Sequence, residues 1–193
     1  MPAAQPQAAF SDNREIPYVQ RAVFFDRDGI VNERLIGEYV RSVREFVFID
    51  AITDVLSLVH ARGYKAVLVS NQQGVGKGLM TMEDLREITE HFQRELVRRC
   101  GVSFDDIRYC TDLDSDNSPR RKPAPGMLLE AAAEGDIDLS SSWMIGDSVS
   151  DVVAGRAAGV RTILVGDHEQ VPEADWIVPC VADVLPVLRE HLL

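Results

Sequence analysis

The feature that most restricts the fold of this chain is an alternation between short apolar runs and segments with helical signals. Apolar runs lie at residues 22–25, 66–69, 107–110, 143–146 and 161–165, and helical signals at 52–62, 81–99, 123–134, 148–158 and 181–192. Apolar strands that alternate with helices are typical of a parallel sheet covered on both faces. The sequence therefore predicts a Rossmann-like three-layer α/β/α fold with a mainly parallel sheet.

Local signals support some of these boundaries. Gly63 follows the first helical segment and suits the left-handed position that ends many helices. Thr81 and Asp84 have the spacing of a capping box, with Asp in place of the usual Glu. Residues 41–49 alternate weakly between polar and apolar side chains, which predicts a small hairpin close to the first strand.

Length and composition bound the domain organisation. The 193 residues suggest one domain. Residues 1–20 are rich in Ala, Gln and Pro and lack the features of a signal peptide, so we expect a flexible tail followed by a single domain at 21–193. No apolar run approaches the ~20 residues that span a bilayer. Three cysteines without CxxC spacing indicate neither disulfides nor zinc, and we expect a cytoplasmic protein.

The charge balance excludes some classes of partner. The chain has 20 Lys and Arg against 31 Asp and Glu, a net charge of −11. Binding to nucleic acid or to anionic membranes takes a basic face, so we expect neither. A small phosphorylated metabolite needs only a local positive pocket and stays compatible with this charge. We expect a monomer.

Polar residues stand where several of the predicted strands end. Open α/β sheets bind ligands beyond the carboxyl ends of their strands. Asp26 and Asp28 follow the first run, Asp147 follows the fourth, and the residues Ser70, Asn71 and Lys122 belong to other connections at this edge. Their clustering predicts an active site there.

The pair of carboxylates Asp26 and Asp28 suggests acid–base and nucleophilic chemistry. A strand-end Asp can attack phosphorus to form an acyl phosphate. The second Asp can protonate the leaving oxygen and later deprotonate water. The alternative is a surface turn with an Asp cap.

Asp147 begins a second polar stretch, which contains Ser148 and a further acid, Asp151. Mg²⁺ prefers one or two carboxylates together with phosphate oxygens and water, and Asp26 and Asp147 could supply those carboxylates. Ser148 and Asp151 suit the start of a helix, so we expect them behind the metal ligands.

Groups that could hold a phosphoryl unit complete the site. Ser70, Asn71 and Gln72 offer a hydroxyl and amides, and Lys122 lies in a basic cluster, 120–122, of an acidic chain. The nearby glycine-rich stretch 74–78 is no P-loop, because Asn71 and Gly78 stand where that motif needs Gly and Ser or Thr.

These residues match, in order, the four motifs of haloacid dehalogenase (HAD)-type phosphatases. The chain resembles this family over residues 21–166 through the stretches 25–32, 69–72, 121–123 and 146–151. The resemblance implies the HAD fold, and the short separations between the motifs leave little room for a large cap domain.

Finer features are similar to the subfamily of heptose 1,7-bisphosphate and histidinol-phosphate phosphatases: Asp-Arg-Asp-Gly, Ser-Asn-Gln-Gln-Gly and Arg-Lys-Pro-Ala-Pro-Gly-Met. Many such relatives carry a zinc loop of Cys-x-His followed by Cys-x-Cys. Here Cys110 matches the first Cys, Asp112 stands in place of His, and no Cys-x-Cys follows. A structural zinc needs about four ligands, so we expect none.

The resemblance also implies roles. Asp26 would attack phosphorus, Asp28 would be the acid and base, and Mg²⁺ would bind Asp26, the backbone carbonyl of Asp28, and Asp147. Ser70 and Lys122 would hold the phosphoryl oxygens. The groups expected to contact the rest of the substrate are Arg121, Asn71, Gln72 and the stretch 34–37, which begins with Arg34.

The expected function is Mg²⁺-dependent hydrolysis of a phosphomonoester through an aspartyl phosphate, with the 7-phosphate of heptose 1,7-bisphosphate as first choice. Histidinol phosphate, another sugar phosphate or a nucleotide monophosphate are alternatives. From other classes, a receiver-like phospho-switch or a non-catalytic binding protein would use the same fold features.

Overall fold

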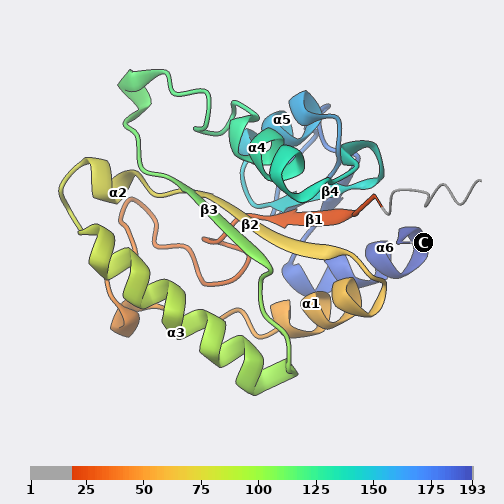
Figure 1. Cartoon of the computed structure of the whole chain (residues 1–193), viewed down its shortest axis with the longest axis horizontal. Helices are drawn as coiled ribbons and strands as arrows, with labels where there is room; N and C mark the ends of the chain where they lie inside the picture. Colours follow the sequence, from red (N-terminus) through yellow and green to blue (C-terminus); the bar gives the residue numbers. More distant parts are fainter. Residues whose placement is uncertain (1–18, 193) are drawn as a thin grey trace, which may run out of the picture.

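A computed structural model describes residues 19–192, whose strands form one twisted sheet (Figure 1). The six strands are β1 Ala22–Phe25, β2 Lys65–Asn71, β3 Asp106–Cys110, β4 Trp143–Gly146, β5 Arg161–Val165 and β6 Trp176–Val178. They pair in parallel in the order β3-β2-β1-β4-β5-β6. The predicted parallel sheet is confirmed. The sequence did not indicate β6, a three-residue strand at the sheet edge.

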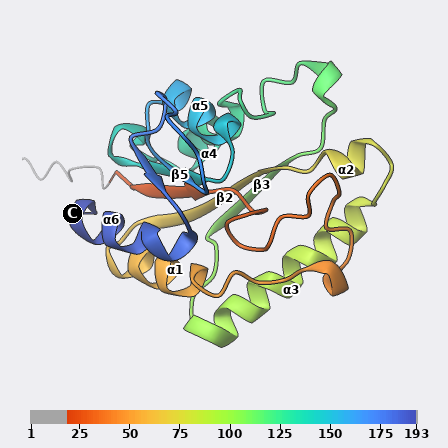
Figure 2. The same cartoon turned by 180° about the vertical axis from the view of Figure 1, so that it is seen from behind.

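Helices cover the sheet on both faces (Figures 1 and 2). One face carries α4 Gly126–Gly135 and α5 Val149–Ala158, and the other carries α1 Ile52–Ala61, α3 Met82–Cys100 and α6 Val184–His191; the short α2 spans Gln73–Gly76. Adjacent strand residues enter different cores: Phe25 packs on the α1 and α3 side and Phe24 on the α4 and α5 side. Because both faces are buried, the strand sequences are uninterrupted apolar runs.

The predicted helix ends are partly right. The Thr81–Asp84 capping box starts α3, and Gly63 has a φ of 71° just after α1. In contrast, α4 begins at Gly126, three residues later than predicted. The preceding residues form a turn in which the Ala124 N–H donates to the Arg121 carbonyl (2.8 Å).

The predicted hairpin at 41–49 is wrong. The segment contains a 3₁₀ helix, Val43–Glu45, and a single antiparallel bridge between Asn32 and Phe48. Phe46 is buried and stacks on Phe92 of α3 with ring centroids 5.7 Å apart. The weak alternation therefore reflects anchoring of a connection on the core and not strand pairing.

Most of the predicted N-terminal tail lies outside the residues that the structure describes. Residues 1–18 of the predicted tail fall outside them, while Gln20 forms a parallel bridge with Ile137 and so is held against the domain. Within 19–192 every named strand belongs to the one sheet, and no separate cap domain is inserted. No helix in this range combines the length and apolar character of a membrane span.

Candidate active site

The strand order places two acidic residues at the same point of the sheet edge. In open α/β sheets the ligand crevice forms where the strand order reverses, beyond the carboxyl ends of the strands. Here that point lies between β1 and β4. Asp26 directly follows β1 and Asp147 directly follows β4, so the topology brings both to this crevice.

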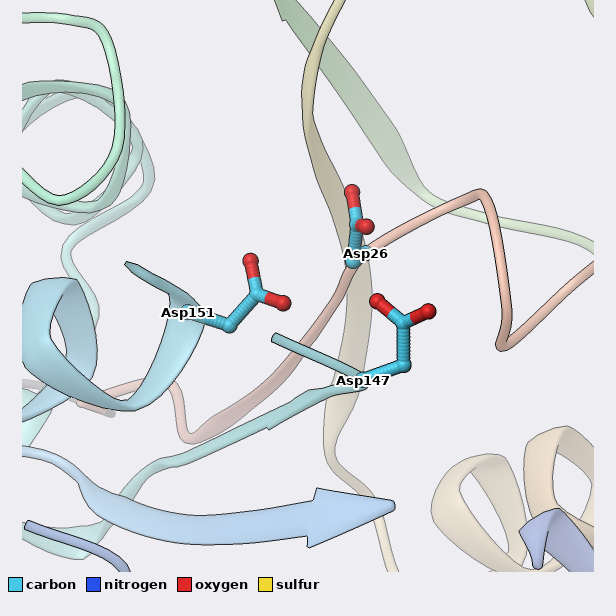
Figure 3. A group of neighbouring side chains, drawn as sticks. All are labelled: Asp26, Asp147 and Asp151. Atoms are coloured by element: carbon cyan, nitrogen blue, oxygen red, sulfur yellow. The ribbon is translucent and has the colours of Figure 1, made fainter. Parts of the chain in front are cut away.

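Three carboxylates converge there. One oxygen from each of Asp26, Asp147 and Asp151 lies within 4.8 Å of the others, and Figure 3 shows the three side chains as near neighbours. Two glycines make this approach possible. A Cβ on Gly29 would lie 2.0 Å from Asp147 Oδ2, and one on Gly146 would lie 2.3 Å from the Asp151 side chain. Neither position can accept a side chain without moving an acid.

Lys122 supplies the positive charge within this acidic group. Its Nζ lies 2.9 Å from Asp26 Oδ1 and 2.6 Å from Asp151 Oδ1, and it donates to the Val69 carbonyl at 2.8 Å. Burial by itself would lower the pKa of Lys122. The charges of Asp151 and Asp26 outweigh that effect and hold its pKa above the usual value. The side chain is therefore a buried ammonium that links two acids.

Asp26 is held through one of its two oxygens. The Ser70 hydroxyl donates to Asp26 Oδ1 at 2.7 Å, and Lys122 donates to the same atom. Both side-chain donors that the described residues offer to this carboxylate thus bind Oδ1. Oδ2 is left for a reacting atom or a cation.

Asp147 is in an environment that opposes its charge. Burial and the nearby Asp26 carboxylate raise the pKa of Asp147 to about 7, although Arg34 partly offsets them. Arg34 Nη1 lies 3.1 Å from Asp147 Oδ2, whereas Oδ1 is buried with no partner among the described residues. An unpartnered carboxylate oxygen beside two further carboxylates is a donor set that fits a hard cation such as Mg²⁺.

Asp28 has a different environment from Asp147. Its carboxylate accepts hydrogen bonds from Arg27, Asn32 and Gln72 at 2.9–3.0 Å. Burial would raise the pKa of Asp28, but the Arg27 charge and these donors hold it below the usual value. Sequence reasoning missed Arg27 and Asn32. The only signal was their position beside Asp28, which does not separate a buried partner from an exposed side chain.

The amides of Asn71 and Gln72 face protein groups. Asn71 donates to the Lys122 carbonyl (2.9 Å) and accepts from the Lys122 N–H (3.0 Å). Gln72 is buried and donates to Asp28 and to the Ser70 hydroxyl. The contacts of both side chains are therefore those of positioning groups.

The other expected residues lie around this centre. Ser148 is the N-cap of α5, and its capping-box partner is Asp151, which also binds Lys122. Arg121 lies in the connection that follows β3, with Nε 3.3 Å from Asp114 and Nη1 buried without a partner among residues 19–192.

The connection 111–125 is held by hydrogen bonds. The Leu113 N–H donates to Asp116 (2.9 Å), and the Gly126 N–H donates to the Pro119 carbonyl (2.9 Å). The buried Cys110 Sγ lies 3.5 Å from the Asp112 carboxylate.

Comparisons with known proteins agree with this geometry. The HAD-hydrolase-like family model matches residues 119–186, which contain Lys122, Asp147 and Asp151. The chain is 38% identical over 145 residues to D-glycero-beta-D-manno-heptose-1,7-bisphosphate 7-phosphatase of Helicobacter pylori (strain J99), covering 75% of this chain and 82% of that relative. The protein of the same name from Pasteurella multocida is 34% identical over 188 residues, covering 89% and 98%.

A solved structure is similar over nearly the whole domain. The D,D-heptose 1,7-bisphosphate phosphatase from B. bronchiseptica, complexed with magnesium and phosphate, superimposes with a TM-score of 0.81 at 28% identity. The match covers 89% of this chain and 99% of that one.

Proposed function

Because the chain belongs to the HAD-like phosphatases, we propose that it removes the 7-phosphate of D-glycero-D-manno-heptose 1,7-bisphosphate in a Mg²⁺-dependent reaction through an aspartyl phosphate. The observation that carries this proposal is the arrangement around Asp26. Ser70 and Lys122 hold its Oδ1, Oδ2 accepts no hydrogen bond from a side chain of the described residues, and one of the carboxylate oxygens lies within 4.8 Å of Asp147. The names of the similar proteins support the choice of substrate.

The first step forms the covalent intermediate. Asp26 Oδ2 attacks phosphorus, and the bond between phosphorus and the sugar oxygen breaks. Asp28 gives that oxygen its proton. The Lys122 ammonium and the Ser70 hydroxyl, which already lie against Asp26, are placed to stabilise the charge on the transferring group.

The second step returns the enzyme to its starting state. A water molecule attacks phosphorus and gives a proton to Asp28, and the bond from phosphorus to Asp26 Oδ2 breaks. Inorganic phosphate leaves, and Asp26 is again a carboxylate. Donors on Asp28 favour its ionised form, which suits the role of a base in this step. The same donors oppose protonation, so Asp28 has to take up a proton before it acts as the acid of the first step.

The acidic group supplies the metal site of this proposal. Asp26, Asp147 and the backbone carbonyl of Asp28 would hold Mg²⁺, which when bound neutralises charge on the phosphoryl oxygens. Asp151 is engaged by Lys122 and by the Ser148 N–H, so we assign it to holding Lys122.

We assign two arginines to binding the rest of the substrate. Arg121 lies in the same connection as Lys122, directly before it, and lines a hollow of about 230 Å³ together with Asn117 and Ser118. Its unpartnered Nη1 would donate a hydrogen bond to a substrate oxygen. Arg34 lies against Asp147.

The test is phosphate release from a panel of substrates. We expect kcat/KM to be highest for heptose 1,7-bisphosphate, lower for histidinol phosphate, other sugar phosphates and nucleotide monophosphates, and abolished by EDTA until Mg²⁺ is restored. Asp26→Asn should lose activity, whereas Asp54→Asn, a change at an exposed acid on α1, should not. An active Asp26→Asn enzyme would refute the nucleophile, and a preference for histidinol phosphate would refute the substrate.

The remaining features of the proposal are a monomeric, cytoplasmic protein without zinc. Its support is the net charge of −11, the absence of a Cys-x-Cys pair from the sequence, and a connection 111–125 that is closed by hydrogen bonds. Light scattering and elemental analysis of the purified protein test the oligomeric state and the zinc content.

A further inference from the structure

We infer that Arg27, Asn32 and Gln72 are positioning residues that hold the Asp28 carboxylate toward the leaving-group oxygen, and that substrates with poor leaving groups depend on them most. This inference rests on the proposed function. The three residues lie behind Asp28, are almost fully buried, and touch no reacting atom in that scheme.

The three donors reach Asp28 on both of its oxygens. Arg27 Nη2 lies 2.9 Å from Oδ1 and from Oδ2, Asn32 Nδ2 lies 2.9 Å from Oδ1, and Gln72 Nε2 lies 3.0 Å from Oδ2. Donors on both oxygens fix the plane of the carboxylate as well as its position. About 23% of the Asp28 side chain stays exposed, so one side remains open to substrate.

Arg27 shows that this arrangement is costly. Its side chain is 1% exposed, and its Nε and Nη1 are buried without partners among the described residues. Among residues 19–192, Asp28 is the one carboxylate within ion-pair distance of the Arg27 guanidinium. Burying a guanidinium with incomplete hydrogen bonding destabilises the fold. The guanidinium donates to both oxygens of Asp28, and we infer that this contact orients the carboxylate.

Asn32 and Gln72 connect this group to the rest of the site. The Asn32 side chain also donates to the Glu33 carbonyl. The backbone carbonyl of Asn32 accepts from the Gly29 N–H (2.7 Å), which closes the turn that carries Asp28. Gln72 donates to the Ser70 hydroxyl at 3.1 Å, and Ser70 binds Asp26. The acid and the nucleophile are thus held by one continuous set of hydrogen bonds.

The leaving group separates the positioning of Asp28 from other effects. A sugar alkoxide needs a proton as it departs, whereas p-nitrophenolate departs readily without one. Since kcat/KM covers the steps up to departure of the leaving group, it excludes hydrolysis of the aspartyl phosphate, which all substrates share. Loss of orientation at Asp28 should therefore lower kcat/KM for alkyl phosphates more than for aryl phosphates.

The experiment compares heptose 1,7-bisphosphate with p-nitrophenyl phosphate at saturating Mg²⁺. Gln72→Met keeps the side-chain volume and removes the donor. We expect kcat/KM to fall about 10-fold for the sugar phosphate and less than about 3-fold for the aryl phosphate. The matched control is Gln93→Met on α3. It removes an amide that pairs with the backbone of Phe104, outside the site, and should leave both kcat/KM values unchanged.

Arg27→Lys is the second variant, for use if Gln72→Met does not fold by circular dichroism. It keeps the charge and loses the guanidinium geometry, and the same asymmetry is expected. Equal losses on both substrates would assign the effect to Ser70 and overturn the inference, as would no loss. A wild-type enzyme that releases no phosphate from either substrate would instead refute the proposed function itself.

Discussion

The side chain of Asn71 holds the backbone of Lys122 through both of its polar atoms, as donor to the carbonyl (2.9 Å) and as acceptor from the N–H (3.0 Å). Asn71 ends β2, so a central strand of the sheet fixes a residue that lies in a long connection. The Lys122 ammonium then reaches Asp26 and Asp151 from that fixed point. Rigid sheet geometry is in this way extended to a loop residue of the site.

Replacing Asn71 by Ala should disturb catalysis through Lys122. Without the paired hydrogen bonds the Lys122 backbone can shift, and a displacement of about 1 Å at a reacting centre can cost on the order of 100-fold in rate. We expect kcat/KM to fall roughly 10- to 100-fold, measured with the best substrate. Ser115→Ala, a change at an exposed residue of the same connection, should have no effect, and an unchanged Asn71→Ala enzyme would contradict the role of Asn71.

Replacing Lys122 by Met should also destabilise the fold, because it leaves the buried Asp26 and Asp151 without their cation. Removing one partner of a buried ion pair typically costs about 3–5 kcal/mol. Denaturant unfolding in EDTA should show a loss of that order for Lys122→Met. The double variant Lys122→Met/Asp151→Asn should recover part of it, because one of the two uncompensated charges is gone. No recovery in the double variant would place the cost in packing instead.

The catalytic core of the site was predictable because strand ends carry it. Apolar runs end at Asp26 and Asp147, and parallel strands bring their carboxyl ends to one edge, so adjacency in space follows from local pattern. Arg27 shows where that reasoning stops. Arg27 is buried where Asn32 and Gln72, from other parts of the chain, also donate to Asp28, and a charged residue between two acids is by itself more typical of a surface.

The errors in the fold have similar causes. Residues 41–49 alternate like a strand, yet their antiparallel pairing is limited to one bridge, between Asn32 and Phe48, and Phe46 binds the core beside Phe92. β6 is only three residues long, and its register with Ile163 and neighbouring residues of β5 is set by the sheet that precedes it. Tertiary contacts decide both segments, and local pattern does not encode them.

The raised pKa of Asp147 predicts how the stability of the metal-free protein depends on pH. The folded-state pKa of about 7 lies above the usual value of 3.8. Between these values the folded chain binds the proton and the unfolded chain does not, so stability falls as pH rises through that window, by at most about 1.4 kcal/mol per pH unit. Denaturation in EDTA from pH 5 to 8 should show this fall, and Asp147→Asn should reduce it. An identical pH dependence in the variant would exclude Asp147 as its source.

The ion pair between Arg34 and Asp147 predicts competition with the metal. The guanidinium lies 3.1 Å from Asp147 Oδ2, so a divalent cation that binds this carboxylate must do so against an existing positive charge. Arg34→Gln should therefore bind Mg²⁺ more tightly, by several-fold, because it removes both the competing partner and the repulsion. The stronger binding should appear in calorimetric titration of the metal-free protein and as a larger rise in Tm at fixed Mg²⁺.

The matched control for this comparison is Arg41→Gln. Arg41 is as exposed as Arg34, at 48% against 47% of the side chain, and its carboxylate partner is Glu45. Both variants change the net charge equally, so a general electrostatic effect would strengthen Mg²⁺ binding to a similar extent in each. Tighter binding confined to Arg34→Gln would locate the competition at Asp147. If Arg34→Gln binds Mg²⁺ no more tightly than Arg41→Gln does, the guanidinium does not compete for the metal site.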